Sequence, residues 1–248
     1  MPTPPSPPSA AAPAGIDPAP ETLAVARRYA RRHNAPDRYS MLAPDVWQTV
    51  QERQRETLML FARQGWLDLA ERHLVEVGCG AGGNLLEFLR LGFAPEHLSG
   101  IELLPERHAQ ARAVLPPALA LHLGDAVRAP VAPGSVDLVV QATVFSSLLD
   151  DTFQQQLADA MWRWLRPGGA VLWYDFAVDN PRNPDVRGVP LARVRALFPQ
   201  AEEVLVRRIT LAPPIARRVC RLHPALYGMF NALPLLRTHR LVWLGKAA

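Results

Sequence analysis

The chain has 248 residues, 49% of them hydrophobic, so it can bury one core and is expected to form one α/β domain with additions. Its formal net charge of +4, from 27 basic and 23 acidic residues, does not indicate nucleic-acid binding. Two cysteines argue against a disulfide framework and favour the cytoplasm. The first residues have neither region of a signal peptide, and no apolar run reaches the roughly 18 residues of a spanning helix.

The first 70 residues divide into a tail and a helical region. Residues 1–20 are mostly Pro, Ala and Ser, which bury too little surface to offset their ordering entropy, so we expect a disordered tail. Within residues 21–70, the pattern predicts one helix over Glu21–His33 and a longer one over Pro44–Ala62. Because both helices precede the first strand, we expect this region to form a lid over the domain of residues 71–248.

A glycine cluster follows the first predicted strand, His73–Val77. The cluster extends from Gly78 to Gly83, and helical spacing resumes over Asn84–Leu91. Glycines allow the backbone to approach a ligand closely, and the free amide groups at the start of a helix point toward it. The stretch therefore predicts a nucleotide-like ligand over the turn.

Strands and helices alternate along the rest of the chain. We expect strands over His97–Glu102, Leu119–Leu123, Val136–Ala142, Ala170–Tyr174, Glu203–Leu211 and Thr238–Leu244, and helices over Pro105–Val114, Asp151–Leu165 and Leu191–Leu197. This order predicts a doubly wound, mostly parallel sheet with its ligand at the carboxyl ends of the strands.

Three carboxylates indicate which ligand binds there. Glu76 lies inside the first strand, where a buried charge is costly unless a cationic ligand group compensates it. Glu102 ends the second strand about twenty residues after the glycines, where an acid can bond both ribose hydroxyls. Asp125 follows the third strand, where it can read the amino edge of an adenine, and Arg166–Gly169 supplies a sharp turn into the fifth strand.

Together these motifs resemble the class I S-adenosylmethionine-dependent methyltransferases (type 11/12-like) over roughly residues 65–248. Val75–Gly82 is similar to that family's first motif, Glu102 to its ribose acid, and Gly124–Ala126 to its adenine loop. The resemblance implies a Rossmann-like seven-stranded sheet with an antiparallel last strand. It also implies that S-adenosylmethionine is bound by Glu76, Gly78, Gly80, Gly82, Glu102, Leu103, Asp125, Ala126 and Gln141.

The methyl acceptor is expected over the ends of the fourth and fifth strands. For a hydroxyl acceptor, Asp175 is the first candidate general base and Asp185 the second. Candidate substrate-binding residues are Tyr39, Phe145, Tyr174, Arg182 and Arg187. The stretch from Trp173 to Arg187 resembles methyltransferases of bacterial surface-glycan biosynthesis, which implies O-methylation of a sugar or glycan.

Other functions stay open at this point. One is methylation of a small natural product or metabolite, and another is a regulatory protein that binds the cofactor without catalysis. The seven histidines show no metal-ligand spacing, so no metal is expected. For Pro214–Arg237, we favour a helix packed on the sheet over contact with a membrane surface. The sequence does not determine the oligomeric state.

Overall fold

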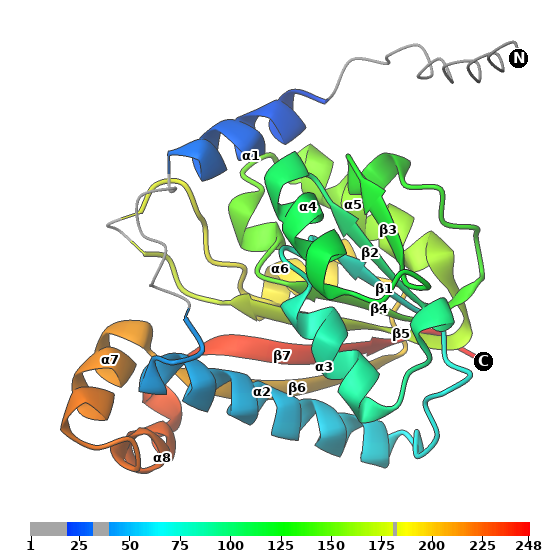
Figure 1. Ribbon diagram of the computed structural model, residues 1–248. Helices are drawn as coiled ribbons and strands as arrows, with labels where there is room; N and C mark the ends of the chain where they lie inside the picture. The colour runs from blue at the N-terminus through cyan, green and yellow to red at the C-terminus, as the bar shows by residue number, and fades with distance from the viewer. Residues whose placement is uncertain (1–18, 32–39, 181–182) are drawn as a thin grey trace, which may run out of the picture.

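The computed structural model describes residues 19–31, 40–180 and 183–248. Its centre is a seven-stranded sheet of order β3-β2-β1-β4-β5-β7-β6 (Figure 1). The strands are β1 Leu74–Val77, β2 Leu98–Glu102, β3 Ala120–Leu123, β4 Val136–Ala142, β5 Leu165–Phe176, β6 Glu203–Leu211 and β7 Arg237–Gly245. The pairs among β1 to β5 are parallel, whereas β7 is antiparallel to both β5 and β6. The predicted fold, including the antiparallel last strand, is confirmed.

Helices cover both faces of the sheet. They are α1 Pro20–Ala30, α2 Pro44–Arg63, α3 Gly83–Leu91, α4 Pro105–Val114, α5 Asp151–Trp164, α6 Leu191–Leu197, α7 Pro213–Leu222 and α8 Leu226–Asn231, with short 3₁₀ turns η2 Pro95–His97, η3 Ala126–Arg128, η4 Phe145–Ser147 and η5 Pro234–Leu236. One core contains Val75, Val139 and Val171 with side chains of α5 and α6. The alternate strand residues, such as Leu74 and Leu138, pack with α2 and α3 in a second core. Successive strand residues point to opposite faces, so both faces of the sheet are buried.

The strand order reverses between β1 and β4. In a doubly wound sheet, the loops after the two strands at this point leave in opposite directions and open a crevice at their carboxyl ends. Glu76 and the glycine turn after β1 therefore lie beside the end of β4, as the sequence predicts.

The two helices before β1 have different positions. α2 packs on the sheet next to β6 and β7, and it contacts α7. α1 instead lies across the carboxyl ends of the strands, where its side chains bond to the loops after β3 and β4 (Figure 1). Within the predicted lid region, α1 alone lies over the carboxyl edge, and α2 is part of the layer on the sheet.

Two predicted boundaries differ from the structure. α1 begins at Pro20, inside the predicted tail, whereas residues 1–18 lie outside the described residues. β5 begins at Leu165, which pairs with Val136 of β4, and the expected turn at 166–169 lies between this pair and the next one, Leu138 with Ala170. Gly168 donates to Ala247 and has a φ of 73°, and the pairing with β4 shifts register there. The predicted turn is thus a bulge within a longer strand.

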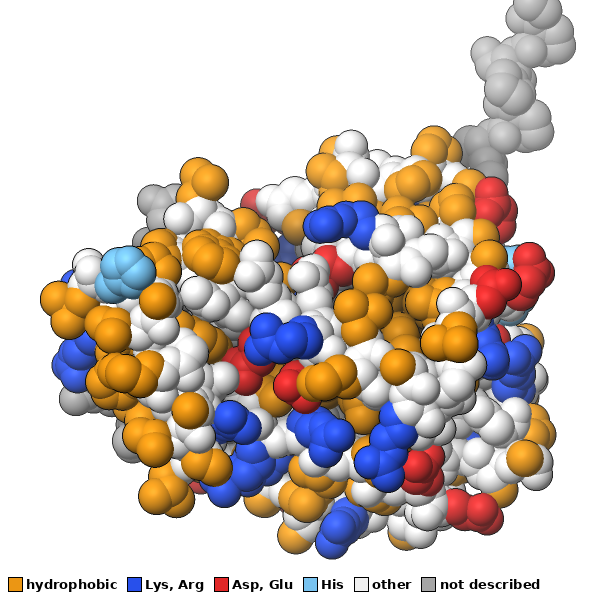
Figure 2. Space-filling model, turned by 90° about the horizontal axis from the view of Figure 1, so that it is seen from below, with side chains coloured by type: hydrophobic (Ala, Val, Ile, Leu, Met, Phe, Trp, Pro, Cys, Tyr) orange, Lys and Arg blue, Asp and Glu red, His pale blue; other side chains and the backbone are white. Residues whose placement is uncertain are grey.

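The connection from β6 to β7 forms the helical segment α7–α8–η5. α7 buries Ala216, Val219 and Cys220, so a helix packs on the protein here, as the sequence predicts. Seen from below, hydrophobic side chains gather at the end of the molecule where α7 and α8 lie (Figure 2). Among the described residues, no helix is both long and apolar enough to cross a bilayer.

Candidate active site

Three carboxylates lie along the carboxyl edge of the sheet, one at each of three neighbouring strands. Glu76 belongs to β1, Glu102 ends β2, and Asp125 begins the loop after β3. Glu76 and Glu102 are both buried. The parallel register places these residues on adjacent strands at one edge, so the structure brings together the three acids predicted for the cofactor site.

Glu76 has one satisfied and one unsatisfied oxygen. Its Oε1 accepts a 2.6 Å hydrogen bond from Asn84 Nδ2, the first residue after the glycine turn. Its Oε2 is buried and has no hydrogen-bond partner among the described residues. Burial raises the pKa of Glu76 to about 7, although the Asn84 bond and the nearby Arg53 charge act in the opposite direction. A buried acceptor without a partner is costly, so this oxygen is suited to a donor from a ligand.

The turn after β1 depends on its glycines. Gly78, Gly80 and Gly82 have φ angles of 67°, 57° and 87°, which other residues rarely adopt. A Cβ at Gly78 would lie 2.6 Å from Val144 Cγ2, and one at Gly82 would lie 2.8 Å from Leu115 Cδ1. The turn is therefore closed against its neighbours in a shape that only glycine permits.

Glu102 holds this turn and the next loop in place. Its Oε2 accepts a 2.8 Å bond from Gly80 N–H, and its Oε1 accepts a 2.8 Å bond from Leu104 N–H. The carboxylate thus holds the residue before α4, and it also orients the glycine turn. Leu103 packs against the first core beside it.

Asp125 connects the loop after β3 to α1. Its Oδ1 accepts a 2.9 Å bond from Val127 N–H and caps η3, in which Ala126 lies. Its Oδ2 is 3.4 Å from the Thr22 hydroxyl of α1. An acid on this loop is suited to an adenine amino group, and α1 covers it from one side.

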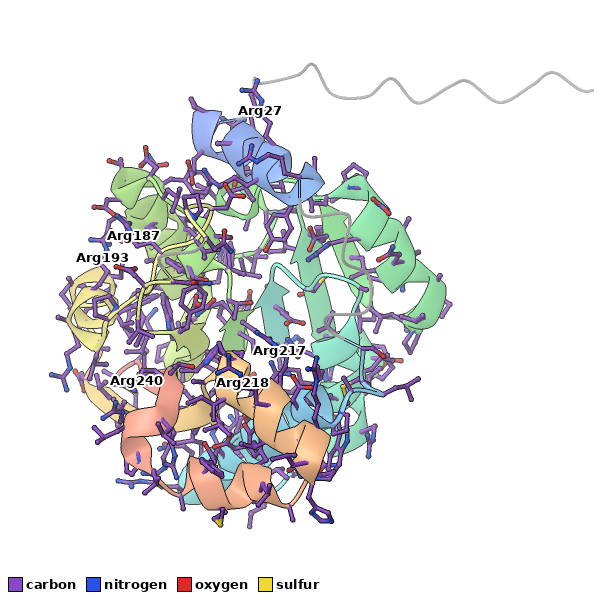
Figure 3. The ribbon with its side chains drawn as sticks, turned by 90° about the vertical axis from the view of Figure 1, so that its left-hand side faces the viewer. Arg27, Arg187, Arg193, Arg217, Arg218 and Arg240 are labelled. Atoms are coloured by element: carbon purple, nitrogen blue, oxygen red, sulfur yellow. The ribbon has the colours of Figure 1, made fainter. Side chains whose placement is uncertain are left out.

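α1 is fixed to the site by several further contacts. Glu21 pairs with Arg28 at 2.5 Å and accepts from Leu149 N–H, and Arg28 donates to Ser147 O. The Arg107 guanidinium of α4 lies 4.7 Å from the centre of the Tyr29 ring of α1. These contacts hold α1 over the loops of the carboxyl edge, as Figure 3 shows from that side.

A cavity lies between α2, α3 and the ends of β4, β5 and β7. Its lining includes Arg53, Asn84, Gln141, Ala142, Tyr174 and Leu241. Arg53 donates to Asn84 Oδ1 at 2.5 Å and lies 5.1 Å from the Tyr174 ring centre. Hydrogen bonds from Arg53 to Asn84 and from Asn84 to Glu76 therefore connect the cavity to the buried carboxylate of β1. Nothing in the local pattern of a long, polar helix distinguishes Arg53, so the sequence does not predict its place at the cavity.

Tyr174, which lines this cavity, is held by Thr210 and His239 behind it. The Tyr174 hydroxyl is 2.9 Å from Thr210 Oγ1, and its ring stacks on His239 with centres 5.0 Å apart. Burial lowers the pKa of His239 to about 4, so the imidazole is neutral near pH 7. Thr210 has a φ of 66°, and Thr143 after β4 has 59°. Both are unusual for β-branched residues, and such strain often occurs at functional sites.

Neither predicted general base is free to act. Asp175 is buried beneath η4, where its two oxygens accept from Ser146 N–H at 3.1 Å and Phe176 N–H at 3.0 Å. Burial raises its pKa to about 7. It points to the α5 side of the sheet, away from the cavity, because it follows Tyr174 by one residue. Asp185 pairs with Arg31 of α1 at 2.6 Å. The expectation that Asp175 faces the acceptor is therefore corrected.

The predicted substrate-binding residues are scattered. Tyr174 lines the cavity, but Phe145 is fully buried against Trp173 with ring centres 4.4 Å apart, so it belongs to the core instead. Arg187 pairs with Asp151 in a separate surface hollow. Tyr39 and Arg182 lie outside the described residues.

Gln141 of β4 both faces the cavity and bonds to the loop that follows its strand. It lines the cavity, and its Oε1 accepts a 3.1 Å bond from Val144 N–H while its Nε2 donates to Tyr174 O at 3.4 Å. It thereby fixes the loop after β4 against the end of β5.

Residues 74–169, from β1 into β5, match the family model described as a methyltransferase domain. The matched segment covers 96 of the 248 residues, and this part of the chain is similar to a methyltransferase domain. The matched segment includes Glu76, the glycine turn, Glu102, Asp125 and Gln141. A comparison with curated proteins finds no match.

Solved structures share the fold of this chain. A SAM-dependent methyltransferase from Methanosarcina mazei is 12% identical with a TM-score of 0.53, over 73% of this chain and 95% of its own. A possible histamine N-methyltransferase from Thermotoga maritima is 15% identical, TM-score 0.57, over 90% and 98%. Phosphoethanolamine N-methyltransferase 2 from Haemonchus contortus, in complex with S-adenosyl-L-methionine, is 14% identical, TM-score 0.56, over 78% and 53%.

Proposed function

We propose that the chain is a class I S-adenosylmethionine-dependent methyltransferase, which binds S-adenosylmethionine along the three carboxylates and transfers the methyl group to a small polar acceptor. The observation that carries this proposal is the buried Oε2 of Glu76, which has no hydrogen-bond partner among the described residues. A protonated amino group, such as that at the methionine end of the cofactor, would supply the missing donor and compensate the buried charge. Gly78, Gly80 and Gly82 would hold the backbone against this end.

The remaining cofactor contacts follow from the order of the strands. We assign the ribose to Glu102 and Leu103, next to β1, and the adenine to Asp125 and Ala126, one strand farther out. Arg53 lies at the opposite end, beside Asn84, and its guanidinium is suited to the cofactor carboxylate. Gln141 would line the middle of the site at the end of β4.

The protein contributes to this reaction mainly by alignment. S-adenosylmethionine supplies an activated methyl group on a positively charged sulfur, whose departure needs no acid. Orientation of two reactants can contribute up to about 7–11 kcal/mol. The residues of this chain that provide it are the rigid turn after β1, the loop after β4 fixed by Gln141, and the cover formed by α1.

For the acceptor we propose a hydroxyl, such as that of a sugar, bound in the cavity beside Tyr174. Because Asp175 and Asp185 are engaged elsewhere, His239 is the group that would take the hydroxyl proton. Its Nδ1 lies 3.0 Å from Thr238 Oγ1, which holds the ring on Tyr174. Neutral imidazole can accept a proton, though one with a pKa near 4 is a weak base.

A second candidate acceptor is an amine. The engagement of both predicted carboxylate bases favours it, since a neutral amine needs no strong base. The names of two structural neighbours, a phosphoethanolamine N-methyltransferase and a possible histamine N-methyltransferase, support the same choice. A sugar or glycan hydroxyl and a small amine are thus the two classes to compare.

One experiment distinguishes these acceptors. The protein is incubated with isotope-labelled S-adenosylmethionine and a panel of sugars, glycans, small natural products and amines, and labelled products are identified by mass spectrometry. A product on oxygen that is lost in His239→Asn supports the hydroxyl proposal, and a product on nitrogen that is retained in this variant supports the amine. Absence of S-adenosylhomocysteine binding by calorimetry would contradict the cofactor assignment itself.

A further inference from the structure

The segment between β6 and β7 has an inner and an outer face. Its inner face is fixed to the protein, because buried Glu52 of α2 accepts hydrogen bonds from Tyr227 at 2.8 Å and Asn231 at 2.6 Å, both in α8. α7 also packs against α2. These contacts hold α7 and α8 in a fixed position on α2, so the outer face of the segment keeps one orientation relative to the sheet.

The outer face exposes large apolar side chains. Leu222 at the end of α7 is 81% exposed, Met229 of α8 is 60%, and Leu233 and Leu235 around η5 are 56% and 88%. All four belong to 14 consecutive residues of this segment, which lies at the end of the molecule where hydrophobic side chains gather in Figure 2. Single exposed leucines are ordinary, but a group of this kind marks an interaction surface.

The exposed side of α7 is positively charged. Arg217, Arg218 and Arg221 are exposed and have no carboxylate partner within the described part of the chain, and Figure 3 shows the first two on the side of α7 that faces the carboxyl edge. The sequence from residue 204 to 248 has eight Arg or Lys residues and no Asp or Glu, whereas the first 203 residues have 19 basic and 23 acidic residues. The chain therefore concentrates its whole positive excess in the part that contains this segment.

We propose that the outer face of α7–α8–η5 docks on an anionic lipid surface. Arginines beside protruding leucines match a bilayer interface, which offers negative headgroups next to hydrocarbon. A nucleic acid would complement the arginines but would leave the four apolar side chains unburied. A second copy of this chain would bring two positive faces together, which is unfavourable.

This docking would orient the active site. β6 is parallel to β5, so the segment that follows it leaves from the same carboxyl edge as the cofactor site. Figure 3 shows α7 and α8 on one side of this edge and α1 on the other. The membrane would therefore lie beside the mouth of the site, within reach of acceptors held at the surface. The docking does not depend on which acceptor is methylated.

Vesicle co-sedimentation tests the proposal with the full-length protein. We expect binding to vesicles that contain phosphatidylglycerol, much weaker binding to phosphatidylcholine alone, and a decrease with salt. The variant Arg217→Gln/Arg218→Gln/Arg221→Gln should bind on the order of 100-fold more weakly, at roughly 5-fold per arginine. The variant Leu233→Ser/Leu235→Ser should lose about 10-fold or more while its salt dependence stays unchanged.

Matched controls make the result specific. Arg90→Gln/Arg163→Gln/Arg195→Gln removes three exposed arginines from α3, α5 and α6, and Leu67→Ser removes a leucine that is 86% exposed elsewhere. Both should bind vesicles like the unmodified protein.

Several results would overturn the proposal. One is no binding of the unmodified protein at low salt, and another is an equal loss in the control variants. Leucine variants that bind normally, with single-stranded RNA competing for the arginines, would assign the face to nucleic acid. A dimer in sedimentation velocity that the leucine variant abolishes, without lipid binding, would assign it to a second copy.

Discussion

The two halves of the carboxyl edge are built in different ways. At the ends of β1, β2 and β3, each acid bonds to a group only a few residues away: Glu76 to Asn84, Glu102 to Leu104 and Asp125 to Val127. At the ends of β4, β5 and β7, the groups come from distant parts of the chain, since Arg53, Thr210 and His239 all contact Tyr174. The first half is fixed by these hydrogen bonds together with those from Gly80 to Glu102 and from Thr22 to Asp125, whereas the second depends on how α2 packs on the sheet.

Two buried carboxylates show the same contrast at the level of single residues. Burial raises the pKa of both Glu76 and Asp175 to about 7. Asp175, however, has both oxygens bonded to backbone amides, and Glu76 has one buried oxygen without a partner among the described residues. A shifted pKa alone therefore does not distinguish a binding group from a structural one, and the hydrogen-bond inventory does.

The largest expected effect is at Glu76. Glu76→Gln should weaken S-adenosylmethionine binding on the order of 100-fold or more, because the amino group of the cofactor would be buried without its counter-charge. Calorimetry measures this loss of affinity. Methylthioadenosine has no methionine amino group, so its affinity should be unchanged. Equal losses for both ligands would contradict the assignment of Glu76 to the amino end.

The same residue predicts a proton exchange on binding. Below its pKa of about 7, Glu76 is mostly protonated in the free protein, and a neighbouring ammonium group would favour its charged form. We therefore expect close to one proton to be released on binding at about pH 6 and almost none at about pH 8. Calorimetry in buffers of different ionisation enthalpy reports this number, and Glu76→Gln should abolish the release.

The next largest effect is at Glu102, in the same half of the edge. Glu102→Gln removes a charged acceptor from Gly80 N–H and from the expected ribose hydroxyls, so we expect roughly 10–100-fold weaker binding. Because the ribose is present in both ligands, S-adenosylmethionine and methylthioadenosine should lose affinity together. A loss confined to S-adenosylmethionine would place the ribose elsewhere.

In the other half, Asp175→Asn should change methyl transfer by less than about 10-fold, whereas loss of a general base costs roughly 10²–10⁴-fold.

The main effect of Asp175→Asn should be on the pH dependence of stability. The raised folded pKa of Asp175 means that its stabilising contribution is complete below about pH 4 and is lost as pH rises through about 7. In this pH window, the free energy of unfolding of Asp175→Asn, measured with urea, should fall less steeply than that of the unmodified protein, by up to roughly 1 kcal/mol per pH unit. A 100-fold loss of activity would restore Asp175 as the base.

How far the sequence could predict the site follows from this contrast. Glu102 and Asp125 were predictable because each lies at a strand end, and the parallel order of the strands brings such ends to one edge. Asp175 also lies near a strand end, but its role was not predictable, because the η4 turn that covers it belongs to the loop after β4. Arg53 reaches the site only through the packing of α2, which a sequence pattern does not fix.

The same limit applies to the outer parts of the fold. The spacing predicts the helix α1 and places two helices before β1, but not that one covers the strand ends while the other joins the sheet layer. That division depends on single contacts, such as those of Thr22 with Asp125 and of Arg28 with Ser147. The bulge in β5 is likewise set by its partners, since Gly168 and Gly169 bond to the last residues of the chain.

The smallest expected effect concerns the contact between α1 and the adenine loop. Thr22→Val keeps the shape of the side chain but removes the hydroxyl that lies 3.4 Å from Asp125 Oδ2. At this length the bond is weak, so we expect cofactor affinity to change by about 3-fold or less. If α1 only covers the site, Thr22→Val should alter the dissociation rate of S-adenosylhomocysteine more than its association rate, which stopped-flow fluorescence can measure. A 10-fold or larger loss of affinity would instead make Thr22 a direct part of the adenine site.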